Sequence, residues 1–315
     1  MLAAEANVGI DPDAIGVQLR GWADLLVDAG IAGLALLALG AVLVLAARTR
    51  GPAPGFAAVV AAPAGQRPVG AGRRPWGRPR ALLDPVTRTG MAVSAPLAVL
   101  VLVGAAFSVV SDDVVERNNL VALDEPLARL LIAHRGPAMT AALQAITNLG
   151  DVVMLMPLLL TIGLLARWRH GSWRLLGFAA ISLAGARLTS TVIKLLVARP
   201  RPGTGALVAA SGYGFPSGHA TAAAAGWLSA ALVIGSLTRR VAVRIAIAVT
   251  GILLVVLVGV SRVYLGVHQA TDVLGGWMLG VLWPAAVLTA NGLANGKAAN
   301  AFPAPACSGL RANDP

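Results

Sequence analysis

The sequence predicts an all-α membrane protein in which several apolar helices cross a bilayer, and three observations support this fold class. The 315 residues are 57% hydrophobic and 12% charged, with a mean hydropathy of +0.76. Such a chain has more apolar surface than a water-soluble domain can bury. The apolar residues form uninterrupted runs of about twenty, which is the length of one membrane span. The charged residues lie in short segments between these runs, as in polytopic membrane proteins.

The net charge and the single cysteine exclude other classes of protein. A formal net charge of +11 would suit a nucleic-acid partner, but the arginines lie between apolar runs, where the positive-inside rule accounts for them. We therefore expect no nucleic-acid partner. The single cysteine, Cys307, lies in a tail rich in proline and alanine and cannot form a disulfide framework or a thiolate metal site. Neither a cofactor nor a metal is expected.

Residues 1–90 are predicted to form an N-terminal extension. Residues 1–28 carry five acids and one arginine and lack the basic start of a secretory signal, so we expect this end to stay uncleaved and outside the cell. Residues 29–47 are long and apolar enough for one transmembrane helix. Residues 48–90 are rich in arginine, proline and glycine, a composition that cannot build a core and predicts a flexible cytoplasmic linker.

Residues 91–290 are predicted to form a core of six further membrane helices. The segment between the first two of them holds six acids against three arginines, with Pro126 and Pro137 dividing short amphipathic pieces, and predicts interfacial helices on the outer face. The arginine-rich turns near 167–174 and 239–244 are expected in the cytoplasm. A flexible cytoplasmic tail is predicted for 291–315. The predicted spans are about 91–110, 149–166, 174–197, 219–237, 241–260 and 270–290.

Three polar clusters lie at the ends of these spans. Their ranges are Lys194–Pro202, Pro216–His219 and Ser261–Asp272. The first two join the spans that end near 197 and begin near 219, and the third joins the last two spans. Both connections fall on the outer side of the membrane in this topology. The clusters therefore predict one extracytoplasmic pocket, built from several helix ends at the depth of the lipid headgroups.

The residue types in the pocket suit a phosphate. Lys194, Arg201 and Arg262 supply three cations, and Lys194 is one of only two lysines in a chain that otherwise uses arginine. Ser217 and Gly218 are placed at the start of a helix, whose free N–H groups attract anions, and glycine lets the ligand approach the backbone. These residues are the predicted phosphate-binding set.

The pocket also contains the groups needed for nucleophilic catalysis. His268 and Asp272 are four residues apart, so Asp272 can hold one imidazole nitrogen while the other attacks. His219 lies at a predicted helix start and can serve as a general acid toward the leaving oxygen. One histidine can thus serve as the nucleophile and the other as the general acid of a double displacement.

These clusters resemble the type 2 phosphatidic acid phosphatase superfamily of lipid phosphate phosphatases. The family signature reads Lys-x6-Arg-Pro, Pro-Ser-Gly-His and Ser-Arg-x5-His-x3-Asp, and the chain matches every position of it. The resemblance covers about residues 90–290. It implies a phosphohistidine on His268, orientation of His268 by Asp272, and proton transfer by His219 without a metal. The phosphoryl oxygens would bind to Lys194, Ser217, Gly218, Arg201 and Arg262. Vanadium haloperoxidases share the pocket but are mainly soluble.

The expected function is hydrolysis of a membrane lipid phosphate or diphosphate at the extracytoplasmic face of the plasma membrane. Undecaprenyl diphosphate, phosphatidic acid and phosphatidylglycerol phosphate remain open as substrates. One alternative is a phosphotransferase that passes the phosphoryl group to another alcohol. A non-catalytic lipid-binding protein is the other alternative, which His219, His268 and Asp272 disfavour. The motifs leave the oligomeric state open.

Arg187 lies within a predicted span and outside the family signature. Arg187 precedes Lys194 by seven residues, which places it on nearly the same helix face and about 10 Å deeper in the membrane. An arginine at this depth is expected to face the interior of the bundle. Two roles stay open for it, a structural clamp that ties its helix to a neighbour and a contact to a second phosphate.

Overall fold

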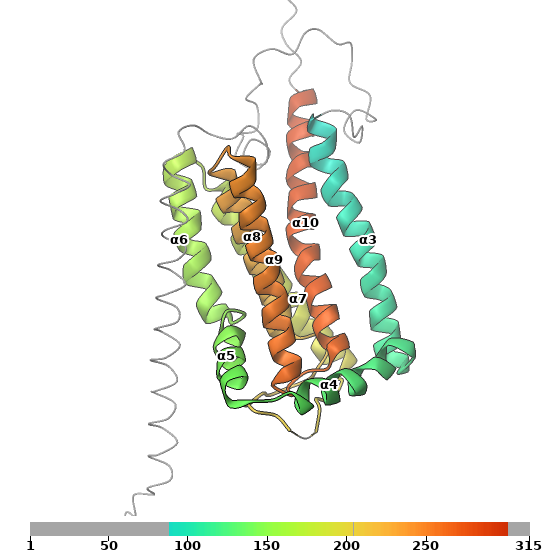
Figure 1. Ribbon diagram of the computed structural model, residues 1–315. Helices are drawn as coiled ribbons and strands as arrows, with labels where there is room; N and C mark the ends of the chain where they lie inside the picture. The colour runs from blue at the N-terminus through green and yellow to red at the C-terminus, as the bar shows by residue number, and fades with distance from the viewer. Residues whose placement is uncertain (1–87, 204, 302–315) are drawn as a thin grey trace, which may run out of the picture. The chain divides into compact units, whose positions relative to one another are not determined.

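The structure, a computed structural model, describes residues 88–203 and 205–301, with side chains from 92 to 294 (Figure 1). The predicted span at 29–47 and nearly all of the predicted linker lie outside the described residues. Contacts divide the chain into a unit Met1–Val44 and a unit Leu45–Pro315, and every described residue belongs to the second.

The described residues form eight α-helices and one short 3-10 helix, without a strand among them. Six of the helices, α3 and α6 to α10, are long and apolar enough to cross a membrane. The predicted all-α membrane bundle with a six-helix core is therefore confirmed. In chain order the elements are α3 (Arg88–Glu116), η2 (Asn119–Leu123), α4 (Asp124–Ala133), α5 (Pro137–Asn148), α6 (Val152–His170), α7 (Arg174–Val197), α8 (Gly218–Ser236), α9 (Val241–Tyr264) and α10 (Ala270–Ala301).

The helices lie close to the predicted spans, and several of them continue past the predicted ends. Helix α7 has the bounds predicted for its span. Helices α3 and α9 continue beyond the predicted ends at 110 and 260, so Asp112 and Arg262 lie in helices rather than in connections. The tail was predicted to begin at 291, and this boundary was wrong, because α10 continues to Ala301. The residues from 291 to 301 are rich in alanine, and the first proline after them is Pro303.

Helix α8 lies at the centre of the bundle and packs against α6, α7, α9 and α10 (Figure 1). Its run of alanines presents little side-chain bulk, so neighbouring backbones approach closely, as is common between membrane helices. Gly280 of α10 shows how close this packing is, because a Cβ there would lie 2.5 Å from the Thr221 carbonyl oxygen and the Ala224 Cβ. A larger residue at this position would push α10 away from α8.

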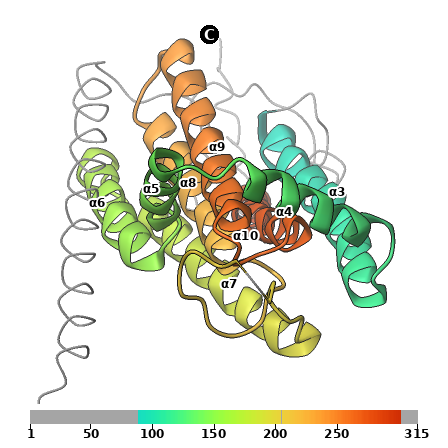
Figure 2. The same cartoon turned by 60° about the horizontal axis from the view of Figure 1, so that its bottom comes forward.

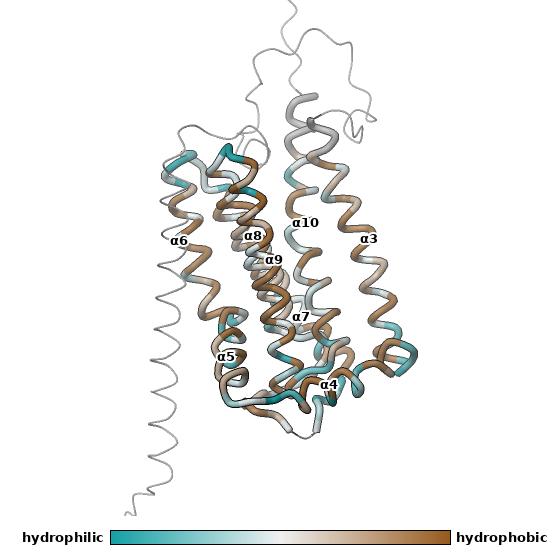
Figure 3. The backbone as a smooth tube through the Cα atoms, in the orientation of Figure 1, coloured by the Kyte–Doolittle hydropathy of each residue, from teal (hydrophilic) through white to brown (hydrophobic). Residues whose placement is uncertain are grey.

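The two ends of the bundle differ in composition. Apolar residues cover the long helices and polar residues gather at both ends (Figure 3). At one end, the residues that flank the α6–α7 turn and those of the α8–α9 turn include arginines and no acids. Trp168 and Trp173 are exposed near the first of these turns, as is common for tryptophan at a membrane interface, and the Arg167 guanidinium lies 5.1 Å from the Trp173 ring centre. The short helices α4 and α5 lie at the other end, where α4 runs across the bundle and α5 leads into α6 (Figures 1 and 2).

Helices α4 and α5 are tied to the end of α9 through Arg135 and Tyr264. The Arg135 guanidinium lies in the connection between the two short helices and donates to the carbonyl oxygen of Tyr264, from Nε at 3.0 Å and from Nη2 at 2.6 Å. Its Nη1 donates to the Gly205 carbonyl oxygen at 2.8 Å. The Tyr264 hydroxyl in turn accepts from the Gly136 backbone N–H at 3.2 Å. These contacts hold the connection between the short helices against the end of α9 and the loop after α7.

Candidate active site

The three polar clusters meet at the end of the bundle that α4 and α5 cover (Figures 1 and 2). The first cluster leaves the C-terminus of α7, the second starts α8, and the third runs from the last turn of α9 into the first turn of α10. The backbone joins two of them directly, because the Ser217 N–H donates to the Asp272 carbonyl oxygen at 2.8 Å. Four helix ends thus supply side chains to one site, as the sequence predicts.

His268 is held at both ring nitrogens. It lies just before α10 rather than within the helix, and its side chain is 2% exposed. Its Nδ1 lies 3.3 Å from Asp272 Oδ2, and its Nε2 lies 3.0 Å from Arg201 Nη1. Because a guanidinium can only donate, Nε2 accepts, and Nδ1 carries the proton that Asp272 receives. The two contacts select the tautomer that carries its proton on Nδ1, and the Nε2 lone pair accepts the hydrogen bond from Arg201.

Burial keeps the imidazole of His268 neutral. Desolvation lowers the pKa of His268 to about 4, and the positive charges of Arg201 and Arg262 act in the same direction, while Asp272 opposes them. Loss of water disfavours the protonated ring more than the nearby carboxylate favours it. The neutral form therefore dominates at neutral pH.

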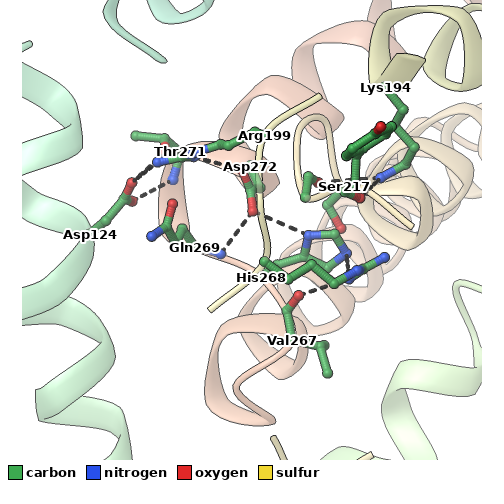
Figure 4. A network of polar contacts seen from close by, with 12 residues as sticks. Asp124, Lys194, Arg199, Ser217, Val267, His268, Gln269, Thr271 and Asp272 are labelled. Carbon is green, nitrogen blue, oxygen red and sulfur yellow. Dashed lines mark hydrogen bonds and ion pairs between the residues drawn. The ribbon is translucent and has the colours of Figure 1, made fainter. Parts of the chain in front are cut away.

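Asp272 is fully buried and receives three hydrogen-bond donors (Figure 4). Its Oδ2 accepts from the Gln269 backbone N–H at 3.0 Å as well as from His268. Its Oδ1 accepts from Arg199 Nη1 at 2.6 Å. A carboxylate with donors on both oxygens stays ionised and cannot rotate away from the imidazole.

The N-terminus of α8 brings Ser217, Gly218 and His219 to the site, as predicted. Ser217 is the N-cap residue and is fully buried, yet its Oγ has no hydrogen-bond partner among the described residues. His219 follows in the first turn, with its Nε2 3.9 Å from Asp151 Oδ2. Asp151 also caps α6, where its Oδ1 accepts from the Val153 N–H at 3.0 Å.

The three predicted cations, Lys194, Arg201 and Arg262, lie near His268 and Asp272. Arg201 donates from Nη1 to the Val267 carbonyl oxygen at 2.8 Å as well as to His268. Lys194 Nζ donates to the carbonyl oxygens of Tyr213 and Gly214, at 2.7 and 3.3 Å. Arg262 is 5% exposed and donates from Nη1 to Thr147 Oγ1 at 2.9 Å, while its buried Nε finds no acceptor in the described part of the chain. Arg201 and Lys194 thus also fix the loop after α7.

Arg187 turns toward the start of α8, the direction expected for an arginine at this depth. Its Nη1 donates to the Gly218 carbonyl oxygen at 3.1 Å. A Cβ on Gly218 would lie 2.7 Å from this nitrogen and 3.8 Å from Lys194 Cε. Arg187 and Lys194 therefore flank the backbone of Gly218, and a side chain at this position would displace the guanidinium.

Four residues of the site are not predicted from the sequence. Arg199 lies inside the first cluster but outside the family signature, and Asp124, Asp151 and Thr271 show no pattern that separates them from their neighbours. Asp124 and Asp151 belong to the acidic segment between the first two core spans. A carboxylate directly before an apolar helix is an N-cap signal, and that signal could have singled out Asp151.

Comparisons with known proteins agree with this geometry. A family model described as PAP2 superfamily matches residues 175–294, which include all three clusters. Phosphatidylglycerophosphatase B of Bacillus subtilis (strain 168) is 34% identical over 170 residues, which are 53% of this chain and 83% of the relative. The crystal structure of a transmembrane PAP2-type phosphatidylglycerolphosphate phosphatase from Bacillus subtilis superposes with a TM-score of 0.56 at 31% identity. It covers 60% of this chain and 93% of that one. The chain therefore belongs to the PAP2 superfamily and is an integral-membrane lipid phosphatase, a hydrolase of phosphoric esters.

Proposed function

We propose that this phosphatase cleaves a membrane lipid phosphate or diphosphate through a phosphohistidine on His268, without a metal. The observation that carries the proposal is the double restraint of the imidazole, with Nδ1 on Asp272 and Nε2 on Arg201. Arg201 Nη1 points at the Nε2 lone pair, and an incoming phosphoryl group has to draw the guanidinium away from that point before Nε2 can attack. A phosphoryl group at that point would receive the guanidinium on an oxygen and the nitrogen on phosphorus.

The first step transfers the phosphoryl group to the enzyme. His268 Nε2 attacks phosphorus, and the bond from phosphorus to the leaving oxygen breaks. The leaving oxygen belongs to the lipid alcohol of a monophosphate or to the lipid phosphate of a diphosphate. His219 gives a proton to that oxygen, and the anionic substrate together with Asp151, 3.9 Å from its Nε2, supplies the negative charge that the protonated ring needs before the transfer. Asp272 stabilises the positive charge that develops on His268.

The second step regenerates the enzyme. Neutral His219 takes a proton from water, the water oxygen attacks phosphorus, and the phosphorus–nitrogen bond breaks. Inorganic phosphate leaves, and His268 returns to the neutral tautomer that Asp272 and Arg201 select. A phosphotransferase, the first alternative, would accept another alcohol in place of water at this step.

Two buried donors support a phosphate at this place. The Ser217 hydroxyl and the Arg262 Nε–H are buried without a partner among the described residues, and a buried donor without an acceptor costs about 1–3 kcal/mol. Phosphoryl oxygens would satisfy both donors. The free N–H groups at the start of α8, together with Lys194 and Arg201, complete the proposed phosphate-binding set, with Gly218 allowing close approach to the backbone.

The substrate is most simply tested with a panel of lipids. The printed function of the Bacillus subtilis relative favours phosphatidylglycerol phosphate, while phosphatidic acid and undecaprenyl diphosphate satisfy the same chemistry. We expect the purified full chain in lipid nanodiscs to release inorganic phosphate from at least one of the three, with EDTA present. Release only on addition of an alcohol would indicate the phosphotransferase. Binding without turnover of any lipid would indicate the non-catalytic protein and contradict the proposal.

The distribution of charge supports an extracytoplasmic site. The arginine-rich turns lie at the end opposite the site, and the positive-inside rule assigns that end to the cytoplasm. This orientation places the C-terminus inside and, with one span at 29–47, the N-terminus outside. In a Cys307→Ser background, Ala209→Cys should react with an impermeant thiol reagent in intact cells. Ser172→Cys in the α6–α7 turn should react only after permeabilisation, and the reverse pattern would contradict the orientation.

Arg187 is expected to act as a clamp between α7 and α8. Hydrogen bonds of charged groups contribute about 1.5–3 kcal/mol, so Arg187→Gln should lower the melting temperature. It should also reduce turnover of monophosphate and diphosphate lipids by the same factor. The measurement compares kcat/KM for both lipid classes with thermal unfolding of the same preparation. A loss confined to diphosphates, at unchanged stability, would instead assign Arg187 to the second phosphate.

A further inference from the structure

A buried polar network lies behind Asp272, on the side away from His268, and the proposed mechanism does not use it. Its members are Asp124, Arg199 and Thr271 (Figure 4). The side chains of Asp124 and Arg199 are 3% and 10% exposed. Asp124 comes from the interfacial helix α4 and Arg199 from the connection after α7, so two separate parts of the fold meet at the first turn of α10.

Asp124 caps α10 from another helix. Its Oδ1 accepts from the Thr271 backbone N–H at 2.8 Å, one of the N–H groups that the first turn of a helix leaves free. Its Oδ2 accepts from Thr271 Oγ1 at 2.6 Å. A carboxylate at this position also interacts favourably with the helix dipole. Asp124 therefore holds the first turn of α10 at Thr271, one residue before Asp272.

Arg199 joins the two carboxylates. Its Nη2 donates to Asp124 Oδ2 at 2.9 Å, and its Nη1 donates to Asp272 Oδ1 at 2.6 Å and to Thr271 Oγ1 at 2.7 Å. The planar guanidinium presents both nitrogens in a fixed geometry, which a lysine ammonium cannot reproduce. Arg199 thereby restrains the one oxygen of Asp272 that His268 and Gln269 leave free.

Charge explains why the network acts as a unit. Removing one partner of a buried ion pair leaves the other charge uncompensated, which costs far more than an exposed pair contributes. Without Arg199, the two carboxylates would lose the cation between them. Without Asp124, Arg199 would lose one of its two anions, and Thr271 would lose both acceptors. In either case Asp272 would no longer be held in one orientation.

We propose that Asp124 and Arg199 are positioning residues, which hold ionised Asp272 in the orientation that selects the nucleophilic tautomer of His268. The inference rests on the proposed function, because it assigns these residues a role in activating His268. It also makes the interfacial helix α4 part of the active site, although that helix supplies no residue of the family signature. The competing explanation is that the network only stabilises the fold.

The pH dependence of activity separates the two explanations. The charged groups near His268 and Asp272 come from every surrounding element, and they are Lys194 (α7), Arg199 and Arg201 (connection after α7), His219 (α8), Arg262 (α9) and Asp124 (α4). Removing the cation of Arg199 leaves the charge of Asp272 less compensated. The carboxylate then stabilises the imidazolium of His268 more strongly or becomes protonated itself. With either effect, activity falls off at a higher pH on the acid side of the pH profile.

The experiment compares variants of the full-length protein in nanodiscs, with the lipid that gives the highest phosphate release. Arg199→Gln should lower kcat by about 10- to 100-fold, by analogy with the loss seen when a residue that orients a metal-ligating side chain is replaced. KM should stay unchanged. The acid limb of kcat/KM should move to higher pH. Asp124→Asn should lower kcat in the same way. The double variant should be no worse than Arg199→Gln alone, because the two residues act through one carboxylate.

Matched controls come from the same helix. Glu125 and Arg129 form an exposed ion pair on α4, with side chains 79% and 70% exposed. Glu125→Gln and Arg129→Gln remove charges next to Asp124 without touching the network, so kcat and the pH profile should stay as in the wild type. Arg199→Lys is the mild variant in case Arg199→Gln does not fold. It should keep the acid limb of the pH profile near its wild-type position, because the positive charge remains. It should still lower kcat, because an ammonium cannot donate to both carboxylates in the fixed geometry of a guanidinium.

The outcomes separate this inference from the proposed function. Loss of activity in His268→Ala, combined with wild-type kcat and pH profile in folded Arg199→Gln or Arg199→Lys, would overturn only the positioning role. A lower melting temperature without a kinetic effect would do the same and would leave a structural network. Activity in His268→Ala would overturn the proposed function and this inference with it.

Discussion

Replacement of His268 by alanine is expected to reduce phosphate release to the background without enzyme. In the proposed mechanism Nε2 of this residue forms the only covalent bond to the phosphoryl group, and no other side chain in the described residues is held in the same way. The variant should also lose inhibition by vanadate, which resembles the trigonal-bipyramidal transition state at phosphorus. Steady-state phosphate release with and without vanadate, at matched protein concentration, measures both effects.

His134 provides the control for this prediction. It lies at the C-terminal end of α4, is exposed, and bonds through Nδ1 to the Leu130 carbonyl oxygen at 2.8 Å, without a carboxylate partner in the described structure. His134→Ala should therefore keep both activity and vanadate sensitivity. Turnover by His268→Ala at a rate near that of the wild type would contradict the assignment of the nucleophile.

Replacement of Asp272 by asparagine is expected to lower kcat by about 10²–10⁴-fold, by analogy with carboxylates that orient a catalytic histidine elsewhere. Arg199 Nη1 needs an acceptor, so the amide oxygen of the variant would take the place of Oδ1. The amide NH₂ would then face His268 Nδ1, which could only accept from it. The imidazole would switch tautomer and carry its proton on Nε2, where the lone pair is needed.

Single-turnover kinetics measure this loss directly, because they separate phosphoryl transfer from product release. Asp112→Asn is a suitable control, since Asp112 lies exposed on α3. The control should react at the wild-type rate. A loss of less than tenfold in Asp272→Asn would mean that the tautomer of His268 is set by another group.

The membrane helices could be predicted because their signal is local. A run of about twenty apolar residues needs no partner to be identified as a span, and α7 has the predicted bounds. The C-terminal end of α10 could not be placed in this way. Past 290 the chain becomes more polar and contains glycines, yet α10 continues to Ala301. Hydropathy locates the membrane-spanning part of a helix and not the turns that extend beyond it.

The predicted site residues were likewise found through fixed spacing within short motifs. The network behind them was not, because it depends on contacts between distant parts of the chain. Asp124 and Thr271 are 147 residues apart, and Asp124 is one of six acids in its segment. Nothing in the sequence separates the buried Asp124 from the exposed Glu125 beside it. Only the fold shows which of the two carboxylates faces α10.

Trapping the phosphorylated enzyme tests the central claim most directly. The full-length protein is mixed with a lipid substrate labelled with ³²P at its terminal phosphate, quenched with alkali within the first turnover, and digested for peptide mapping. We predict an alkali-stable, acid-labile label on the peptide that contains His268, and its absence in His268→Ala. Label on another residue, or product formation in the first turnover without any labelled enzyme, would contradict a phosphohistidine at this position.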